Sequence, residues 1–166
     1  DLLDENILKT LLIKNNQIII NSKENNLSTL WECCQIPDFT KSSHNQHIDI
    51  VKKVYEFLMS NQKKIPNEWM RIQLAGLDND SGNIDTLANR ISHVRTWAYV
   101  SYKKNWVENS DYWIAKTKDI EDKLSAKLHE DLSKSFVDRR ISILSKNLKQ
   151  DEKLEAKISE KDEVII

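Results

Sequence analysis

The most regular apolar pattern in this chain lies in the stretch Gly82–Trp106, which reads GNIDTLANRISHVRTWAYVSYKKNW. The apolar residues that recur in it at helical spacing are Ile84, Leu87, Ile91, Val94 and Ala98. Asn83 directly precedes this pattern and is a suitable N-cap, because its side chain can accept a hydrogen bond from a backbone N–H of the first turn. The stretch therefore predicts a central helix that packs on one side and presents Arg90, His93 and Arg95 on its other sides.

The composition of the whole chain favours helices over sheets. Its 166 residues are enough for one domain, and 39% of them are hydrophobic, which suits a modest core. Charged residues make up 31%, whereas there are only 2 glycines and 2 prolines. Tight turns, barrels and phosphate-binding loops use glycine and proline much more heavily. We therefore expect a mainly α protein, an irregular bundle of about five to six helices.

Helical patterns continue upstream of the central stretch. Apolar spacing and turn residues predict helices at about 4–14, 22–36, 44–60 and 66–77, with Asp4, Ser22 and Pro66 at or near the first turns of three of them. Gln17–Ile20 is a short β-branched run that fits either a strand or a buried connector. Asp78–Asn83 is polar and contains Gly82, so it is predicted to be a hinge before the central helix.

A long C-terminal helix is predicted to follow the central one. Ser110 is a suitable N-cap, and apolar residues then step mostly by four from Trp113 to Leu148. This helix would be roughly 57 Å long, more than a compact domain needs, so we expect it either to kink or to project toward another part of a larger protein. The alternating residues beyond it and the apolar end Val164–Ile166 predict a short β-hairpin-like tail.

Charge is unevenly distributed along the chain, although the net charge is only -1. Residues 62–107 contain seven basic and four acidic side chains, a local charge of +3, whereas residues 151–166 contain three basic and six acidic ones, a local charge of -3. A nucleic-acid contact is therefore expected in the middle of the chain rather than in its tail. The candidate contact residues are Arg90, Arg95, Lys103, Lys104, Trp106, Arg139 and Arg140.

Each of these candidates also has a purely structural explanation. Basic side chains on helix surfaces form intramolecular ion pairs, and Asp138 next to Arg139 and Arg140 makes such pairing easy. Tryptophans at helical spacing are more often core or interface anchors than platforms for unpaired bases. This applies to all five of them: Trp31, Trp69, Trp97, Trp106 and Trp113.

No motif for catalysis or metal binding is complete in this chain. The 2 glycines do not supply the glycine-rich turn, lysine and hydroxyl residue of a P-loop. Cys33 and Cys34 are adjacent rather than two to four residues apart, so they form a poor zinc site with His44 and His47. The acidic C-terminal helix lacks the Glu-x-x-His pairs of a di-metal bundle, because His129 has no glutamate three positions before it. We predict no catalytic residue, metal ligand or cofactor here.

Cysteine usage and hydropathy indicate a cellular location. The only cysteines are the neighbouring Cys33 and Cys34, which cannot cross-link distant segments, so a reducing compartment is expected. No run approaches the length of a membrane span, and the start has no basic region followed by an apolar one. We therefore expect a cytoplasmic protein without membrane partners. The start at Asp1 and the apolar end suggest a piece of a longer polypeptide.

Three stretches together resemble one protein family. They are LWECCQIPDF at Leu30–Phe39, IDTLANRISHVRTWAYV at Ile84–Val100 and IEDKLSAKLHEDLSKSFVDRR at Ile120–Arg140. They resemble the helical region C-terminal to the motor in bacterial superfamily-two helicases of the alphaproteobacterial type, relatives of the mitochondrial degradosome RNA helicase (the Suv-three type). Cys33 stands where the family usually has valine.

The resemblance implies an accessory region of an ATP-dependent RNA or DNA helicase. In that family, two RecA-like domains bind ATP, Mg²⁺ and nucleic acid, and the helical region packs on them to hold or guide the strand. The implied partners are an upstream RecA-like motor, single-stranded RNA or DNA, and additionally a nuclease. Residues 1–40 would then pack on the motor, 41–150 would form the accessory domain, and 151–166 would begin a truncated β segment. A helical scaffold that binds proteins but no nucleic acid is the alternative.

Overall fold

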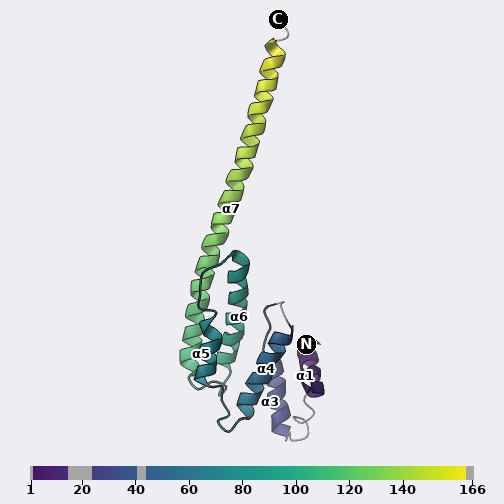
Figure 1. Ribbon diagram of the computed structural model, residues 1–166, viewed down its shortest axis with the longest axis vertical. Coiled ribbons are helices and arrows are strands. Elements are labelled where there is room, and N and C mark those ends of the chain that lie inside the picture. Colours follow the sequence, from purple (N-terminus) through teal and green to yellow (C-terminus); the bar gives the residue numbers. More distant parts are fainter. Residues whose placement is uncertain (1, 15–23, 41–43, 164–166) are drawn as a thin grey trace. The chain divides into compact units, whose positions relative to one another are not determined.

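The computed structural model describes residues 2–14, 24–40 and 44–163, and these residues form helices, connecting turns and no named strand (Figure 1). The helices are α1 (Leu2–Lys14), α3 (Glu24–Cys34), α4 (His44–Met59), α5 (Asn67–Ala75), α6 (Ile84–Tyr102) and α7 (Ser110–Glu163). The predicted mainly α fold with a long C-terminal helix is confirmed. None of these described helices is both long enough and apolar enough to cross a membrane.

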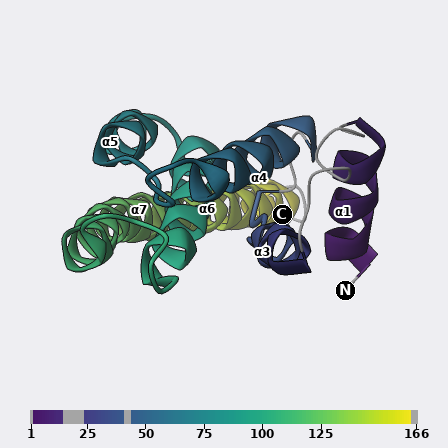
Figure 2. The ribbon, with the colours of Figure 1, turned by 90° about the horizontal axis from the view of Figure 1, so that it is seen from below.

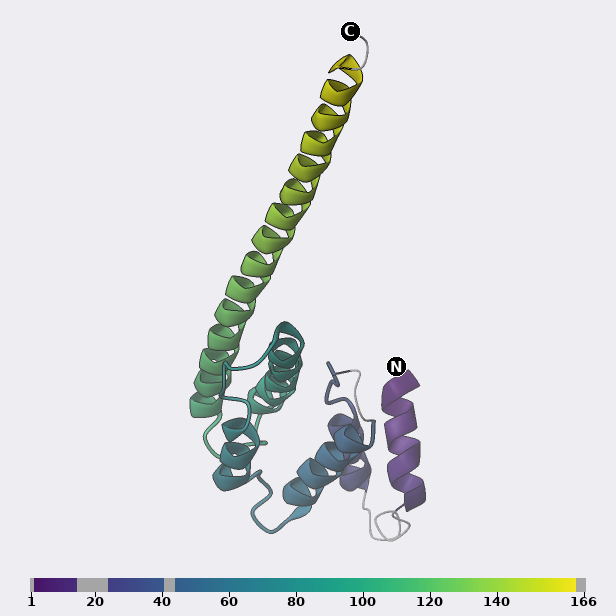
Figure 3. The ribbon, with the colours of Figure 1, turned by 45° about the horizontal axis from the view of Figure 1, so that its top comes forward.

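The chain forms two compact units, Asp1–Ser125 and Ala126–Ile166, whose boundary lies inside α7. In the first unit α1, α3 and α4 pack on one another (Figure 3). Ile7 and Leu11 of α1 and Leu30 of α3 are buried there. The leading helices α1 and α3 therefore pack together with α4 in the first unit.

Helix α6 is central to the first unit and lies between α4 and the first part of α7 (Figure 2). Its buried side is formed by Leu87, Ile91, Val94, Trp97 and Val100, so the predicted apolar face is confirmed. Burying side chains of this size stabilises a fold by roughly 1.5–3 kcal/mol each relative to leaving them in water. Ile84 and Ala98, at the margins of this face, are only partly buried.

The start of α6 is determined by two neighbouring residues. Asn83 has extended backbone, and its side chain accepts hydrogen bonds from the backbone N–H of Thr86 (2.8 Å) and from the Thr86 hydroxyl (2.8 Å), so the predicted N-cap is confirmed. Gly82 has a φ of +109°, a conformation that side chains with a Cβ disfavour. A Cβ at this position would also lie 3.0 Å from the Thr86 methyl group. The Asp78–Asn83 segment therefore turns sharply into the helix.

A row of aromatic rings connects three helices of the first unit. The Trp69 ring of α5 lies 5.1 Å from the Phe57 ring of α4 and 5.2 Å from the Trp97 ring of α6, the second pair in an edge-to-face arrangement. Such pairs contribute about 0.5–1.5 kcal/mol beyond their buried area. Trp113 of α7 is also buried, and its indole N–H donates to the Asn67 side chain of α5 (2.8 Å). These tryptophans act as interior anchors.

Helix α7 is longer than predicted. It continues to Glu163, so the β segment predicted for residues 151–166 is wrong over residues 151–163. Those residues are mostly Glu, Lys, Asp, Leu and Ala with no Gly or Pro, and helix propensity over this length outweighs the short alternation of apolar residues. Ser110 begins the helix, but its hydroxyl donates to the Ser101 carbonyl instead of capping α7. Two predicted elements, the possible strand at Gln17–Ile20 and the apolar end Val164–Ile166, lie outside the described residues.

Candidate functional site

The two arginines of α6 that were predicted to contact phosphates both have partners within the protein. One guanidinium nitrogen of Arg90 donates to the carbonyls of Asn79 (2.8 Å) and Ser81, and so holds the Asp78–Asn83 segment against α6. The Nε of Arg95 donates to Glu121 of α7 at 2.9 Å. The Arg95 side chain is about half exposed, so this ion pair is a weak one, worth about 0–1 kcal/mol. Both arginines tie parts of the first unit together.

The predicted residues at the end of α6 lie close to one another. Lys103 is the C-cap of α6, and its ammonium lies 5.4 Å from the Tyr99 ring centre and 5.6 Å from that of Trp106. Lys104 is exposed. Trp106 is only 5% exposed, so most of its ring is unavailable as the open stacking platform considered above.

A backbone contact brings Lys63 close to the end of α6. The Ile65 N–H donates to the Trp106 carbonyl at 2.7 Å, and Ile65 forms an isolated parallel bridge with Val107. As a result Lys63 and Lys104 line the same groove, of about 400 Å³, together with Asn105, Trp106 and Glu32. We call this groove, which Lys63 and Lys104 line and which Lys103 adjoins through its contact with Trp106, the lysine groove.

Sequence reasoning did not select Lys63. Its closeness to Lys104 depends on the bridge between Ile65 and Val107, which no local pattern indicates. The only available signal was that Lys63 belongs to the basic middle segment of the chain.

Arg139 and Arg140 belong to the second unit, whereas the residues of the lysine groove belong to the first. Both are exposed on α7, and the Arg140 guanidinium lies 5.8 Å from the Phe136 ring centre. The same unit exposes several large apolar side chains, each about half accessible or more: Leu132, Phe136, Val137, Ile141, Ile143, Leu144, Leu148, Leu154 and Ile158.

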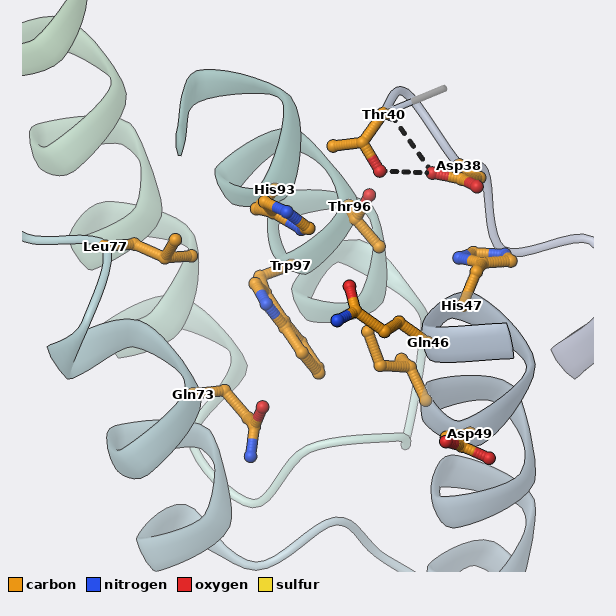
Figure 4. Close-up of a pocket in the computed structure, with 11 residues that line it drawn as sticks. Asp38, Thr40, Gln46, His47, Asp49, Gln73, Leu77, His93, Thr96 and Trp97 are labelled. Carbon is orange, nitrogen blue, oxygen red and sulfur yellow. Dashed lines mark hydrogen bonds between the residues drawn. The ribbon is translucent and has the colours of Figure 1, made fainter. Parts of the chain in front are cut away.

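A second cavity, of about 320 Å³, lies between α4, α5 and α6, and we call it the Trp97 cavity (Figure 4). Trp97 and His93 of α6, Gln73 of α5 and Gln46 of α4 are among its lining residues. Figure 4 shows the Trp97 ring with Gln73 on one side and Gln46 on the other. Pockets that bind small ligands have volumes of about 300–1,000 Å³, so this cavity suits a small ligand.

The rim of the Trp97 cavity is held by the 36–40 segment. Thr40 donates to one Asp38 carboxylate oxygen from both its backbone N–H (3.0 Å) and its hydroxyl (2.8 Å). The Thr96 hydroxyl of α6 donates to the Pro37 carbonyl at 3.0 Å. This rim is therefore tied to α6 and has a defined shape.

His47 lines the same cavity and is 5% exposed. Its Nε2 lies 3.0 Å from the Ile36 carbonyl, which can only accept, so Nε2 is the protonated nitrogen. Burial lowers the pKa of His47, an effect that the charge of Asp38 and the bond to Ile36 partly oppose. A neutral His47 therefore leaves Nδ1 as an acceptor.

Cys33 and Cys34, at the end of α3, are both buried. Burial, with a further contribution from Cys34, raises the pKa of Cys33 far above its usual range, and burial likewise raises the pKa of Cys34 to about 12. Both are therefore neutral thiols at neutral pH. Of the other zinc candidates, His47 is buried whereas His44 is exposed. Among the residues that the structure describes, no three His, Cys, Asp or Glu side chains are grouped as metal ligands.

Comparisons of this chain with protein-family models, with curated proteins and with solved structures found no match.

Proposed function

We propose that this chain is an accessory region of an ATP-dependent helicase and that its lysine groove helps to hold a single strand of RNA or DNA. In this proposal the region works in the cytoplasm next to a RecA-like motor, which supplies ATP and Mg²⁺ binding and hydrolysis. The resemblance of the three stretches supports the helicase class. The lysine groove supports the contact with nucleic acid.

The observation that carries the proposal is the bridge between Ile65 and Val107. It places Lys63 and Lys104, both exposed, along one groove, with Lys103 above Trp106 at its side. Glu32 is the single acidic side chain among the described residues that line this groove. Lysine ammonium groups bind phosphates as point charges, and each contact releases counterions from the strand. The groove therefore fits a phosphate backbone better than either arginine of α6 does.

The first test is charge reversal in the groove. The double variant Lys63→Glu/Lys104→Glu is expected to bind a fluorescent 20-nucleotide single strand at least about tenfold more weakly at 50 mM salt, measured by anisotropy. The slope of log affinity against log salt is expected to become shallower by about 1.4, because each lost contact with a single strand removes about 0.7. Lys9→Glu/Lys118→Glu is the matched control: it changes the charge equally at two other exposed lysines of the first unit.

Two outcomes of this titration would contradict the proposed site. Equal loss of affinity in the control variant would show that only net charge matters. A larger loss on reversing Arg90 and Arg95 than on reversing the two lysines would place the strand on α6 instead. Because Arg90 holds the Asp78–Asn83 segment, each arginine variant is first compared with the parent protein by thermal unfolding.

A scaffold that docks on the RecA-like motor without binding nucleic acid is the second candidate. The nine large apolar side chains exposed between Leu132 and Ile158 favour it, because large exposed apolar patches mark interaction surfaces. If the unmodified chain shows no strand binding at 50 mM salt, the scaffold function is preferred.

A further inference from the structure

The indole N–H of Trp97 is an unused hydrogen-bond donor. Trp97 is 2% exposed and lines the cavity between α4, α5 and α6. No acceptor among the described residues bonds to this N–H, although the Trp97 backbone carbonyl accepts from the Ser101 hydroxyl at 2.8 Å. A buried donor without an acceptor costs about 1–3 kcal/mol. A ligand with an acceptor atom in this cavity would remove that cost.

The other polar groups of the Trp97 cavity narrow the class of ligand. The amides of Gln46 and Gln73 each offer both donors and acceptors, on opposite sides of the Trp97 ring (Figure 4). Asp38 and the neutral His47 add acceptors at the rim. The ligand must therefore carry donors as well as acceptors.

The apolar and charged residues that line the Trp97 cavity narrow the class of ligand further. Ile50 and Leu77 supply apolar surface, and Trp97, which is 2% exposed, adds only a small part of its ring. None of the described residues that line the cavity is lysine or arginine, whereas two are aspartates, so a phosphate group would find no cation there. A purely hydrocarbon ligand would leave the Trp97 N–H unpaired. An uncharged planar ring with polar edges needs no cation and can still accept a hydrogen bond from the Trp97 N–H.

We propose that the Trp97 cavity binds an unpaired nucleobase. The base would accept from the Trp97 N–H, pair its polar edge with the amides of Gln46 and Gln73, and leave its sugar and phosphate outside. Recognition of splayed bases by aromatic rings and side-chain amides is a common way to read single strands. This inference rests on the proposed function, because an unpaired base enters as part of a bound strand.

Free nucleosides test the cavity without the lysine groove. Adenosine, guanosine, cytidine and uridine are titrated into the full chain and followed by saturation-transfer NMR and calorimetry, with ribose 5-phosphate as the ligand that lacks a base. At least one nucleoside is expected to bind, and ribose 5-phosphate is not. Trp97→Phe, which keeps a ring but removes the donor, and Gln73→Leu are each expected to weaken binding about fivefold, the effect of losing one hydrogen bond.

The controls separate this inference from the proposed function. Gln62→Leu changes an exposed glutamine elsewhere in the first unit and should bind nucleosides like the parent chain. Lys63→Glu/Lys104→Glu should also retain nucleoside binding while losing affinity for the strand. Nucleoside binding without strand binding would overturn the lysine groove alone, and strand binding without nucleoside binding would overturn the cavity alone.

Folding of the Trp97→Phe variant is checked by circular dichroism. If it does not fold, the Gln73→Leu variant alone tests the proposed base contact. Gln73 is partly exposed, so its replacement leaves the core intact. Equal affinity of Gln73→Leu and the parent chain would overturn the proposed base contact, as would absence of binding by all four nucleosides at millimolar concentration.

Discussion

At the scale of the residue, His47 makes the stability of this protein depend on pH. It is buried in α4, and burial is the main cause of its lowered pKa. As the pH falls below about 6.5, the unfolded chain binds a proton at this ring before the folded protein does. Stability linked to His47 is therefore complete above that pH and is lost as the pH falls toward the folded-state pKa.

Chemical denaturation between pH 7.5 and 5.5 measures this effect. The free energy of unfolding is expected to decrease through His47 by at most about 1.4 kcal/mol per pH unit, the limit for one proton. His47→Gln can still donate to the Ile36 carbonyl, so it should remove this part of the pH dependence. His44→Gln, an exposed histidine on the same helix, is the control. An unchanged pH profile in His47→Gln would rule out this role.

At the scale of the element, α6 depends on interactions at its first turn as well as on its buried face. Asn83 satisfies a backbone N–H that no residue of the helix can satisfy. Asn83→Ala is expected to lower the free energy of unfolding by about 1 kcal/mol, measured by urea denaturation. Asn89→Ala, at an exposed position in the middle of α6, should have no cost or a small gain, because alanine has the higher helix propensity. Equal losses in both variants would contradict the capping role.

The features of the helices that could be predicted are those formed by residues close together in the sequence. The apolar face of α6 and its Asn83 cap involve residues within a few positions of one another, so spacing alone indicates them. The end of α7 was predicted wrongly because a short alternation at 154–158 was weighed above the helix-forming composition around it. Helix propensity adds up over many residues, whereas three alternating residues need a partner strand to be stable.

At the scale of the whole molecule, the two units differ in how much of α7 is covered. Ile120 and Leu124 are buried in the first unit, whereas residues 132–161 of the second unit are all exposed. An isolated helix relies on its own hydrogen bonds, which open far more readily than those of a packed helix. In hydrogen exchange on the full chain, the amides of 132–160 are therefore expected to exchange at least about tenfold faster than those of α6.

The same exchange experiment tests whether the second unit is covered by anything. Equal protection of both regions at micromolar concentration would contradict an uncovered helix and would indicate that the apolar side chains from Leu132 to Ile158 are buried against a partner or another copy. Repeating the measurement at tenfold lower concentration separates these two cases, because self-association depends on concentration.

Local sequence patterns were sufficient to predict the helical class, the apolar face of α6 and the cap at its start. Periodicity and capping involve residues within about one turn of each other, so they can be recognised in the amino-acid sequence alone. Only the folded structure shows that Arg90 and Arg95 bind within the protein, that Lys63 and Lys104 share a groove, and that Trp97 lines a cavity while its N–H has no partner among the described residues. Those outcomes depend on which distant segments pack together, and side-chain packing between helices has no signature in local spacing.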